Sequence, residues 1–315
     1  MTTAVMEQQT WSVGPASFRY QLGDVVLFRR TFTAMLHRTH FTAMPVDGFA
    51  AVPDPSILPA EADAVMFRSA PASGPLKKIS REAHYIRYVP NSYHRYYVDL
   101  NGSFDDYLKK FTSKSRSTLL RKVRKFSEQP GARWHAYRNP SELQVFLDLA
   151  ARVSAKTYQE RLMDAGIPTT PEYREHVLAL AERGSAIGAV LFLGDAPVSY
   201  IFSPAQDGVL LYEYVGFDPE YRELSPGTVL QYYLLQQLFS DREFRIFDFT
   251  EGEGQHKAFF ATHNVYCADV YFFRRTLWNY LTIVAHAGVN AFSSGLGKFL
   301  DKLKVKSAIK KFLRK

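Results

Sequence analysis

The chain of 315 residues is long enough to form one large domain or two lobes with a proper hydrophobic core. Hydrophobic residues make up 46% and charged residues 22%, which is usual for globular proteins, and no run of about 18 apolar residues predicts a membrane-spanning helix. The single cysteine, Cys267, excludes an internal disulfide framework and lies in an apolar run, where we expect a buried, inert thiol. The first residues lack the basic start and apolar core of a signal peptide, so we expect a cytoplasmic protein.

The net charge of +8 is concentrated in two segments. Residues 109–125 contain eight basic residues and no acid, and residues 298–315 contain eight basic residues and one acid. The remainder of the chain is therefore net acidic. Basic segments attract phosphates, nucleic acid or anionic lipid, but the charge alone does not choose among these partners.

The first hundred residues give weak structural signals. Residues 20–32 fit a strand followed by the start of a helix, and residues 45–75 look like a loop interrupted by a strand at 64–67. Alternation of apolar and polar residues predicts a strand over residues 93–100. No internal repeat and no motif that carries chemistry is visible here.

A basic helix is predicted before the middle of the chain. Ser103-x-x-Asp106 reads as a capping box that opens one helix, and a second helix follows over residues 113–126. One face of the second helix is apolar and the other is basic. The apolar positions are Leu119, Leu120, Val123 and Phe126. The basic face is either the solvated side of a packed helix or a dock for a phosphorylated or acidic partner.

Pro130-Gly131 interrupts the helical pattern, and we place a lobe boundary there. The predicted organisation is a first lobe over 1–130, a second lobe over 131–276 and a basic helical tail over 277–315. A helix capped by Ser141 opens the second lobe.

The rest of the second lobe alternates between helical and strand periodicity. The predicted helices span residues 171–183, 228–239 and 255–262, and the predicted strands span 186–193, 198–202, 209–217, 245–249 and 265–273. Turn signals such as Gly194-Asp195 separate them.

The triplet Ser225-Pro226-Gly227 opens the helix over 228–239. Ser225 suits the N-cap, Pro226 suits the first helical position, and Gly227 leaves the start of the helix bare of side chain. Free N–H groups and the positive end of the helix dipole bind anions, above all phosphate. The triplet is either an ordinary helix start or a phosphate site.

Arg222-x-x-Ser225-x-Gly227 resembles the Q/R-x-x-G-x-G/A pyrophosphate loop of GNAT acyltransferases, with serine in place of the first glycine. The order VGFDPEY, SPG, FDFTEGEGQHKAFF within residues 152–273 resembles the BioF2-like or CelD-like branch, which is related to the FemAB peptidyltransferases. The resemblance implies an α/β fold of GNAT type. In that fold a mixed, mostly antiparallel twisted sheet is flanked by helices. In this family an N-terminal lobe of this size often resembles a degenerate copy of the same fold.

The resemblance also implies that acetyl-CoA or another acyl-CoA is the co-substrate and that no metal is used. The loop would hold the pyrophosphate, and the pantetheine arm would lie along the preceding strand. The expected cofactor-binding residues are Val215, Gly216, Phe217, Arg222, Ser225, Pro226, Gly227 and Thr228.

Two carboxylates stand in otherwise aromatic strands and are candidates for the catalytic base. Glu213 is the first choice because its strand would carry the cofactor, and Asp248 is the second. Each is alternatively an edge residue or one half of a structural ion pair. The resemblance implies that Lys156, Tyr158 and Lys257 contact the acceptor, although each equally fits a solvated surface.

The expected function is transfer of an acyl group to an amine, with an amino sugar or a cell-envelope or polysaccharide precursor as acceptor. One alternative is a FemAB-like transferase that uses aminoacyl-tRNA. Another is a non-catalytic module that binds a membrane surface or nucleic acid, although no aromatic-basic motif favours nucleic acid. Residues 297–315 are either a frayed basic end or a helix lying on an anionic membrane, which would suit a lipid-linked acceptor.

Overall fold

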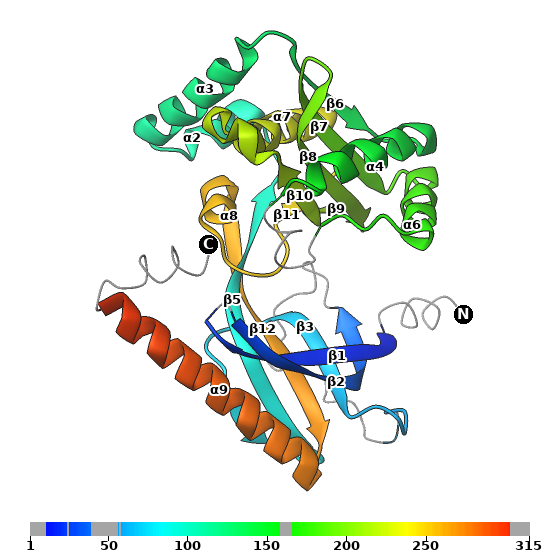
Figure 1. Ribbon diagram of the computed structural model, residues 1–315, viewed down its shortest axis with the longest axis vertical. Coiled ribbons are helices and arrows are strands. Elements are labelled where there is room, and N and C mark those ends of the chain that lie inside the picture. The colour runs from blue at the N-terminus through cyan, green and yellow to red at the C-terminus, as the bar shows by residue number, and fades with distance from the viewer. Residues whose placement is uncertain (1–10, 24, 39–55, 57, 158–165, 303–315) are drawn as a thin grey trace. The chain divides into compact units, whose positions relative to one another are not determined.

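The computed structural model describes residues 11–23, 25–38, 56, 58–157 and 166–302 (Figure 1). The chain divides into two compact units. The terminal unit combines residues 1–94 with residues 265–315, and the central unit spans residues 95–264. Tyr158 and the last part of the basic tail, residues 303–315, lie outside the described residues.

The terminal unit is built from long strands and one long helix. Its elements are β1 (Trp11–Leu22), β2 (Val25–Arg38), β3 (Ala64–Pro71), β4 (Ile79–Arg81), most of β5 (Tyr85–Asp99), most of β12 (His263–Arg274) and α9 (Leu277–Lys302). β1 and β2 form an antiparallel hairpin, β2 runs parallel to β3, and β3 is antiparallel to β12.

The helix expected to begin within residues 20–32 is wrong, because this segment belongs to the β1–β2 hairpin. Buried Phe18 and Tyr20 alternate with exposed Arg19, and buried Phe32 and Ala34 alternate in the same way. A period of two is the pattern of a strand with one buried face. These aromatic residues pack with Tyr88 and Ile283 into one core.

The central unit contains a mixed, mostly antiparallel sheet, which confirms the predicted fold class. From the end of β5, the strand order is β11 (Ile246–Asp248), β9 (Val209–Leu211), β8 (Ala196–Gln206), β7 (Ala186–Leu193) and β6 (Ala132–Tyr137). β10 (Tyr214–Phe217) also pairs with β8. The β9–β11 pair is parallel, and the other pairs in this unit are antiparallel.

Helices cover both faces of this sheet. They are α2 (Phe104–Lys109), α3 (Ser113–Ser127), α4 (Pro140–Ser154), α6 (Pro171–Glu182), α7 (Pro226–Asp241), α8 (Gln255–Phe260) and the 3₁₀ helix η2 (Pro219–Leu224). Ile187, Ala189 and Leu191 of β7 join the core of α3 and α7, whereas Val190 and Phe192 join the core of α4 and α6. Because β7 is buried on both faces, it is apolar along its whole length.

The boundaries of the two units differ from those of the lobes predicted from the sequence, because the central unit begins at Arg95 and not at residue 131. The basic helix α3 was placed at the end of the first lobe, yet Leu119 and Phe126 pack into the core of the central unit. α2, α3 and α7 lie side by side in the upper part of Figure 1. Among the described residues, no helix has the length and apolar character needed to cross a membrane.

Two local predictions need correction. Asn139 rather than Ser141 caps α4, because Pro140 occupies the first helical position and Glu142 completes a capping box. The strand expected over 209–217 is broken at Tyr212 and Glu213 into β9 and β10. This break lies at the site described below.

Gly188 tests the packing of the central unit. A Cβ atom at this position would lie 2.5 Å from the buried ring of Phe146, so we expect Gly188→Ala to lower the free energy of unfolding by roughly 1–3 kcal/mol. A Cβ atom on Gly288 in α9 would meet nothing within 4 Å, so Gly288→Ala should raise the free energy of unfolding by about 0.5–1 kcal/mol. Urea unfolding of the two variants checks the opposite signs; equal effects would contradict this packing.

Candidate active site

Two neighbouring strands of the central sheet separate at Tyr212. β9 pairs in parallel with β11 as far as Leu211 and Asp248, and the N–H of Tyr212 donates to the carbonyl oxygen of Asp248 at 2.8 Å. Beyond this point β10 pairs with β8 alone. Within the described part of the chain, the other edge of β10 therefore has no partner strand.

A cavity of about 460 Å³ lies against β10 and is lined entirely by residues of the central unit. Its wall includes residues from β8, β10, the start of α7, and α8. Six of the residues predicted to bind the cofactor line it, namely Val215, Gly216, Phe217, Arg222, Gly227 and Thr228. The other two, Ser225 and Pro226, form the start of α7 but do not line the cavity.

The start of α7 is uncapped. Ser225 is the N-cap residue, but its backbone is left-handed (φ 53°, ψ 48°) and its hydroxyl makes no capping hydrogen bond. The N–H groups of Gly227 and Thr228 precede the first intrahelical bond, which runs from Val229 to the Ser225 carbonyl. An added Cβ on Gly227 would contact only Phe217, at 3.9 Å. Two N–H groups and the positive end of the helix dipole are therefore available to an anion.

The loop before α7 is fixed by two lysines. The buried Asp218 accepts hydrogen bonds from Lys156 Nζ at 2.7 Å and from the Glu220 N–H at 3.1 Å. The hydrogen bond with Asp218 raises the pKa of Lys156. Lys125 Nζ on α3 donates to the Glu223 carbonyl oxygen at 3.1 Å. Lys156, predicted to contact the acceptor, contacts this loop and does not line the cavity.

Gly216 has no room for a side chain, because Tyr200 and Thr157 pack against its Cα atom. An added Cβ would lie 2.5 Å from the ring of Tyr200 and 2.8 Å from the methyl group of Thr157. Glycine at this position therefore lets the Tyr200 ring pack against β10. Tyr200 is 1% exposed and its hydroxyl donates to Ser154 Oγ at 3.3 Å.

The two predicted bases lie in different environments, and neither lines the cavity. Asp248 is fully buried and accepts hydrogen bonds on both oxygens from Arg95, with a further one from the Thr250 N–H at 2.9 Å. It is half of a buried ion pair, which was the structural alternative for this residue. Glu213 is exposed at the break between β9 and β10. The pKa of Tyr173 is raised first by the burial of Tyr173 and second by the charge of Glu213.

His256 lines the cavity and was not predicted as a catalytic residue. Its ring centroid lies 6.0 Å from that of Tyr212. Burial by the surrounding atoms, together with the charge of Lys257, lowers its pKa, although part of the residue is exposed. Lys257 does not line the cavity, and its Nζ donates to the Glu251 carbonyl oxygen at 2.7 Å. Burial also lowers the pKa of Lys257.

Gln231 also lines the cavity and was not among the predicted site residues. It is 2% exposed, and neither its amide nitrogen nor its amide oxygen has a hydrogen-bond partner among the described residues. A signal was available, because Gln231 is a polar residue on the helical face of Gly227, Leu234 and Leu238.

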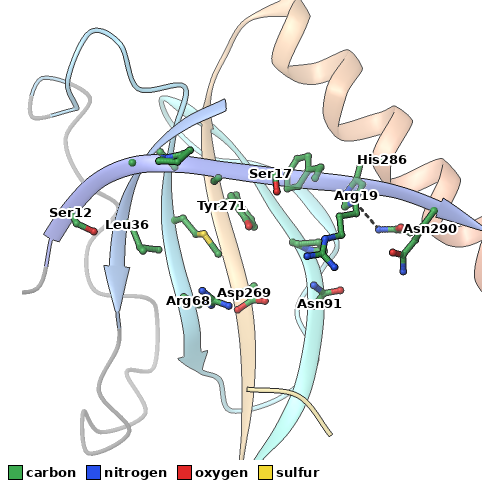
Figure 2. Close-up of a pocket in the computed structure, with 18 residues that line it drawn as sticks. Ser12, Ser17, Arg19, Leu36, Arg68, Asn91, Asp269, Tyr271, His286 and Asn290 are labelled. Atoms are coloured by element: carbon green, nitrogen blue, oxygen red, sulfur yellow. Dashed lines mark hydrogen bonds between the residues drawn. The ribbon is translucent and has the colours of Figure 1, made fainter. Parts of the chain in front are cut away.

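A second cavity, of about 570 Å³, lies within the terminal unit and contains none of the predicted site residues. Figure 2 shows Arg19 extending from β1 toward Asn91 of β5, and Arg68 beside Asp269. In its wall, Asn290 and His286 are joined by a hydrogen bond of 3.3 Å. Among the described residues, no group of histidine, cysteine, aspartate and glutamate could hold a metal ion.

Residues 113–258 match the family model of the acetyltransferase (GNAT) domain. The chain thus contains a GNAT-type acetyltransferase domain. The match begins at α3, so the basic helix is part of this domain, and it ends within α8, just after His256 and Lys257. No curated protein sequence matches the chain.

Several solved structures are similar to this chain. FemX is 13% identical, with a TM-score of 0.50 over 88% of this chain and 91% of FemX. The C-terminal domain of a putative lysylphosphatidylglycerol synthetase from Agrobacterium fabrum is 12% identical (TM-score 0.47, 68% of each chain). L-PGS from Bacillus licheniformis is 15% identical (TM-score 0.46, 71% of this chain and 72% of that one). At these identities the likeness to FemX concerns the fold, and it extends well beyond the GNAT domain.

Asp248→Asn separates a structural from a catalytic role. The substitution removes the carboxylate that pairs with the buried Arg95 guanidinium, so we expect the free energy of unfolding to fall by roughly 3 kcal/mol. The double variant Arg95→Met/Asp248→Leu should be more stable than Asp248→Asn, because it removes the guanidinium together with the carboxylate. Urea unfolding measures both. A stable Asp248→Asn protein that lacks transferase activity would instead identify Asp248 as a catalytic residue.

Proposed function

We propose that the GNAT domain transfers an acyl group, in the simplest case acetyl, from acyl-CoA to an amine. The observation that carries the proposal is the uncapped start of α7, which opens onto the same cavity as the unpaired edge of β10. Arg222 lines this cavity and makes no ion pair with any described residue. Two free N–H groups and a guanidinium form a setting for the pyrophosphate of coenzyme A.

The remaining donor contacts follow from β10. An extended pantetheine arm can add to the open edge of the strand through backbone hydrogen bonds, and this would bring the thioester toward Val215 and Gly216. A backbone N–H there would stabilise the oxyanion of the tetrahedral intermediate. The contact of Lys125 with the loop places the basic helix α3 beside the phosphate setting, which favours an anionic donor.

His256 is our candidate for the general base. The amine must lose a proton during acyl transfer, and a base with a depressed pKa is already neutral at pH 7. Glu213 remains the alternative base. We assign Asp248 a positioning role, because Arg95 engages both of its oxygens.

The acceptor is proposed from the family resemblance alone. The BioF2-like branch implies an amino sugar or a cell-envelope or polysaccharide precursor. Lys257, next to His256, stays our candidate for an acceptor contact. The proposed membrane contact through residues 297–315 concerns side chains outside the described residues.

A second candidate function is aminoacyl transfer from tRNA, as in FemAB-like enzymes. The fold likeness to FemX over 88% of the chain and the exposed basic face of α3 favour it. Binding of coenzyme A in the absence of tRNA separates the two functions.

The phosphate setting predicts that Arg222→Gln weakens coenzyme A binding. Loss of one charge-assisted hydrogen bond costs roughly 1.5–3 kcal/mol, which corresponds to about a tenfold to hundredfold rise in Kd. Gly227→Glu should abolish binding, because it places a carboxylate at the helix start. Arg152→Gln on α4 is the matched control, since it removes an exposed arginine that does not line the cavity. Isothermal titration calorimetry gives each Kd; unchanged values for both site variants would refute the phosphate site.

The base assignment predicts a pH profile. With His256 as base, kcat/KM should rise with pH through the lowered pKa of His256, and then rise less steeply through the pKa of the acceptor amine. In His256→Gln this low-pH limb should vanish and kcat should fall about a hundredfold. The acceptor amine contributes its own limb to both profiles and so serves as an internal reference. If Glu213→Gln loses the limb and His256→Gln keeps it, the two residues exchange roles.

A further inference from the structure

Gln231 lies on the buried face of α7, one helical turn after Gly227. Its side chain belongs to the wall of the cavity, yet only 2% of the residue is exposed. Both polar atoms of its amide are buried, and neither finds a partner among the described residues. Gln231 is thus a polar side chain held at the cavity wall without any contact within the described protein that explains its polarity.

An amide buried in this way lowers stability, because it loses its hydrogen bonds to water and gains none from the protein. A methionine or leucine would fill the same space without that penalty. Its neighbours in the cavity wall include Tyr200, Val215 and Phe260, and the nearby Ser199 hydroxyl already donates to the Gly216 carbonyl oxygen. Because no described residue supplies a partner, whatever occupies the cavity is the partner that the amide lacks.

The chemistry of the side chain defines what that partner is. A glutamine amide donates through nitrogen and accepts through oxygen, which complements a secondary amide that offers one carbonyl and one N–H. The spacing adds a second condition. Gln231 lies four residues after Gly227, which is roughly 6 Å along the helix axis, so the ligand carries its amide a short distance inward from the anionic group at the helix start.

We infer that Gln231 binds a carboxamide of the donor's phosphopantetheine arm; this rests on the proposed acyl-CoA function. In such an arm a short carbon chain separates the phosphate from the first amide, in keeping with the spacing along α7. An aminoacyl ester of RNA has a ribose, and no amide, between its last phosphate and the acyl carbon. Gln231 is thus a specificity-determining residue that selects a pantetheine thioester over an RNA ester.

The test compares Gln231→Met with Gln236→Met, which makes the same change at an exposed position of the same helix. Two probes are titrated by calorimetry: coenzyme A, which has the pantetheine arm, and adenosine 3′,5′-bisphosphate, which lacks it. We expect Gln231→Met to weaken coenzyme A at least tenfold and to leave the bisphosphate unchanged. Without ligand, Gln231→Met should be at least as resistant to urea as the parent protein, because an unpartnered amide has been removed. Gln236→Met should bind both probes as the parent does.

The outcomes separate the inference from the function on which it rests. If the parent protein binds neither probe, the acyl-CoA function fails, and the amide assignment fails with it. If the parent and Gln231→Met bind coenzyme A equally, an ordered water satisfies the amide, and the inference is overturned while the function stands. If Gln231→Met loses both probes, the substitution has disturbed the phosphate site, and the amide assignment is likewise overturned. Gln231→Leu provides a second apolar replacement with the same expectations.

Discussion

The geometry of the site depends on the point at which the parallel pairing of β9 and β11 ends. Asp248 is the last residue of β11, and its carboxylate is held between the Arg95 guanidinium and the N–H of Thr250. Thr250 adopts a left-handed conformation (φ 59°), and its hydroxyl donates to the Tyr212 carbonyl oxygen at 3.3 Å. One buried ion pair therefore ends the parallel pairing and turns the chain away. Because β11 leaves at this point, β10 keeps an open edge beside the cavity.

The charged groups around the cavity serve different purposes. Lys156, Lys125 and Asp218 are engaged with the loop before α7, so they fix the backbone that presents Arg222. Arg222 itself has no described counter-ion. Lys156 and Asp218 neutralise each other and position the loop, whereas Arg222 is suited to bind an anion.

Periodicity revealed the elements that are regular along the chain. β7, β8 and α7 have long patterns that follow one period, and they were found within a few residues. Part of β2 was expected to begin a helix, because its strand character depends on pairing with β1 and β3, which the local pattern does not contain. The break at Tyr212 depends on contacts with Asp248 and Thr250, far away in the sequence, and could not be predicted from local propensity.

The site residues likewise divide into those recognisable from local sequence and those whose roles depend on distant contacts. Glycine and arginine in a loop motif are recognisable from spacing, and Arg222, Gly227 and Thr228 do share one cavity. The ion pairing of Asp248, the lowered pKa of His256 and the unpartnered amide of Gln231 depend on which atoms surround these residues. Their roles could therefore be assigned only from the fold. Lys156 shows the difference clearly, because only the structure brings it to Asp218.

The open edge of β10 also bears on aggregation. An exposed strand edge is a template on which another chain can add, and it promotes aggregation when it is long and flat. Here the unpaired stretch is only four residues long, and three of those residues line a cavity rather than an outer rim of the sheet. A narrow ligand arm can reach such an edge, whereas the full strand of a neighbouring molecule, with its side chains, cannot. The recess thus shields this edge of β10 from pairing with a strand of another copy of the protein.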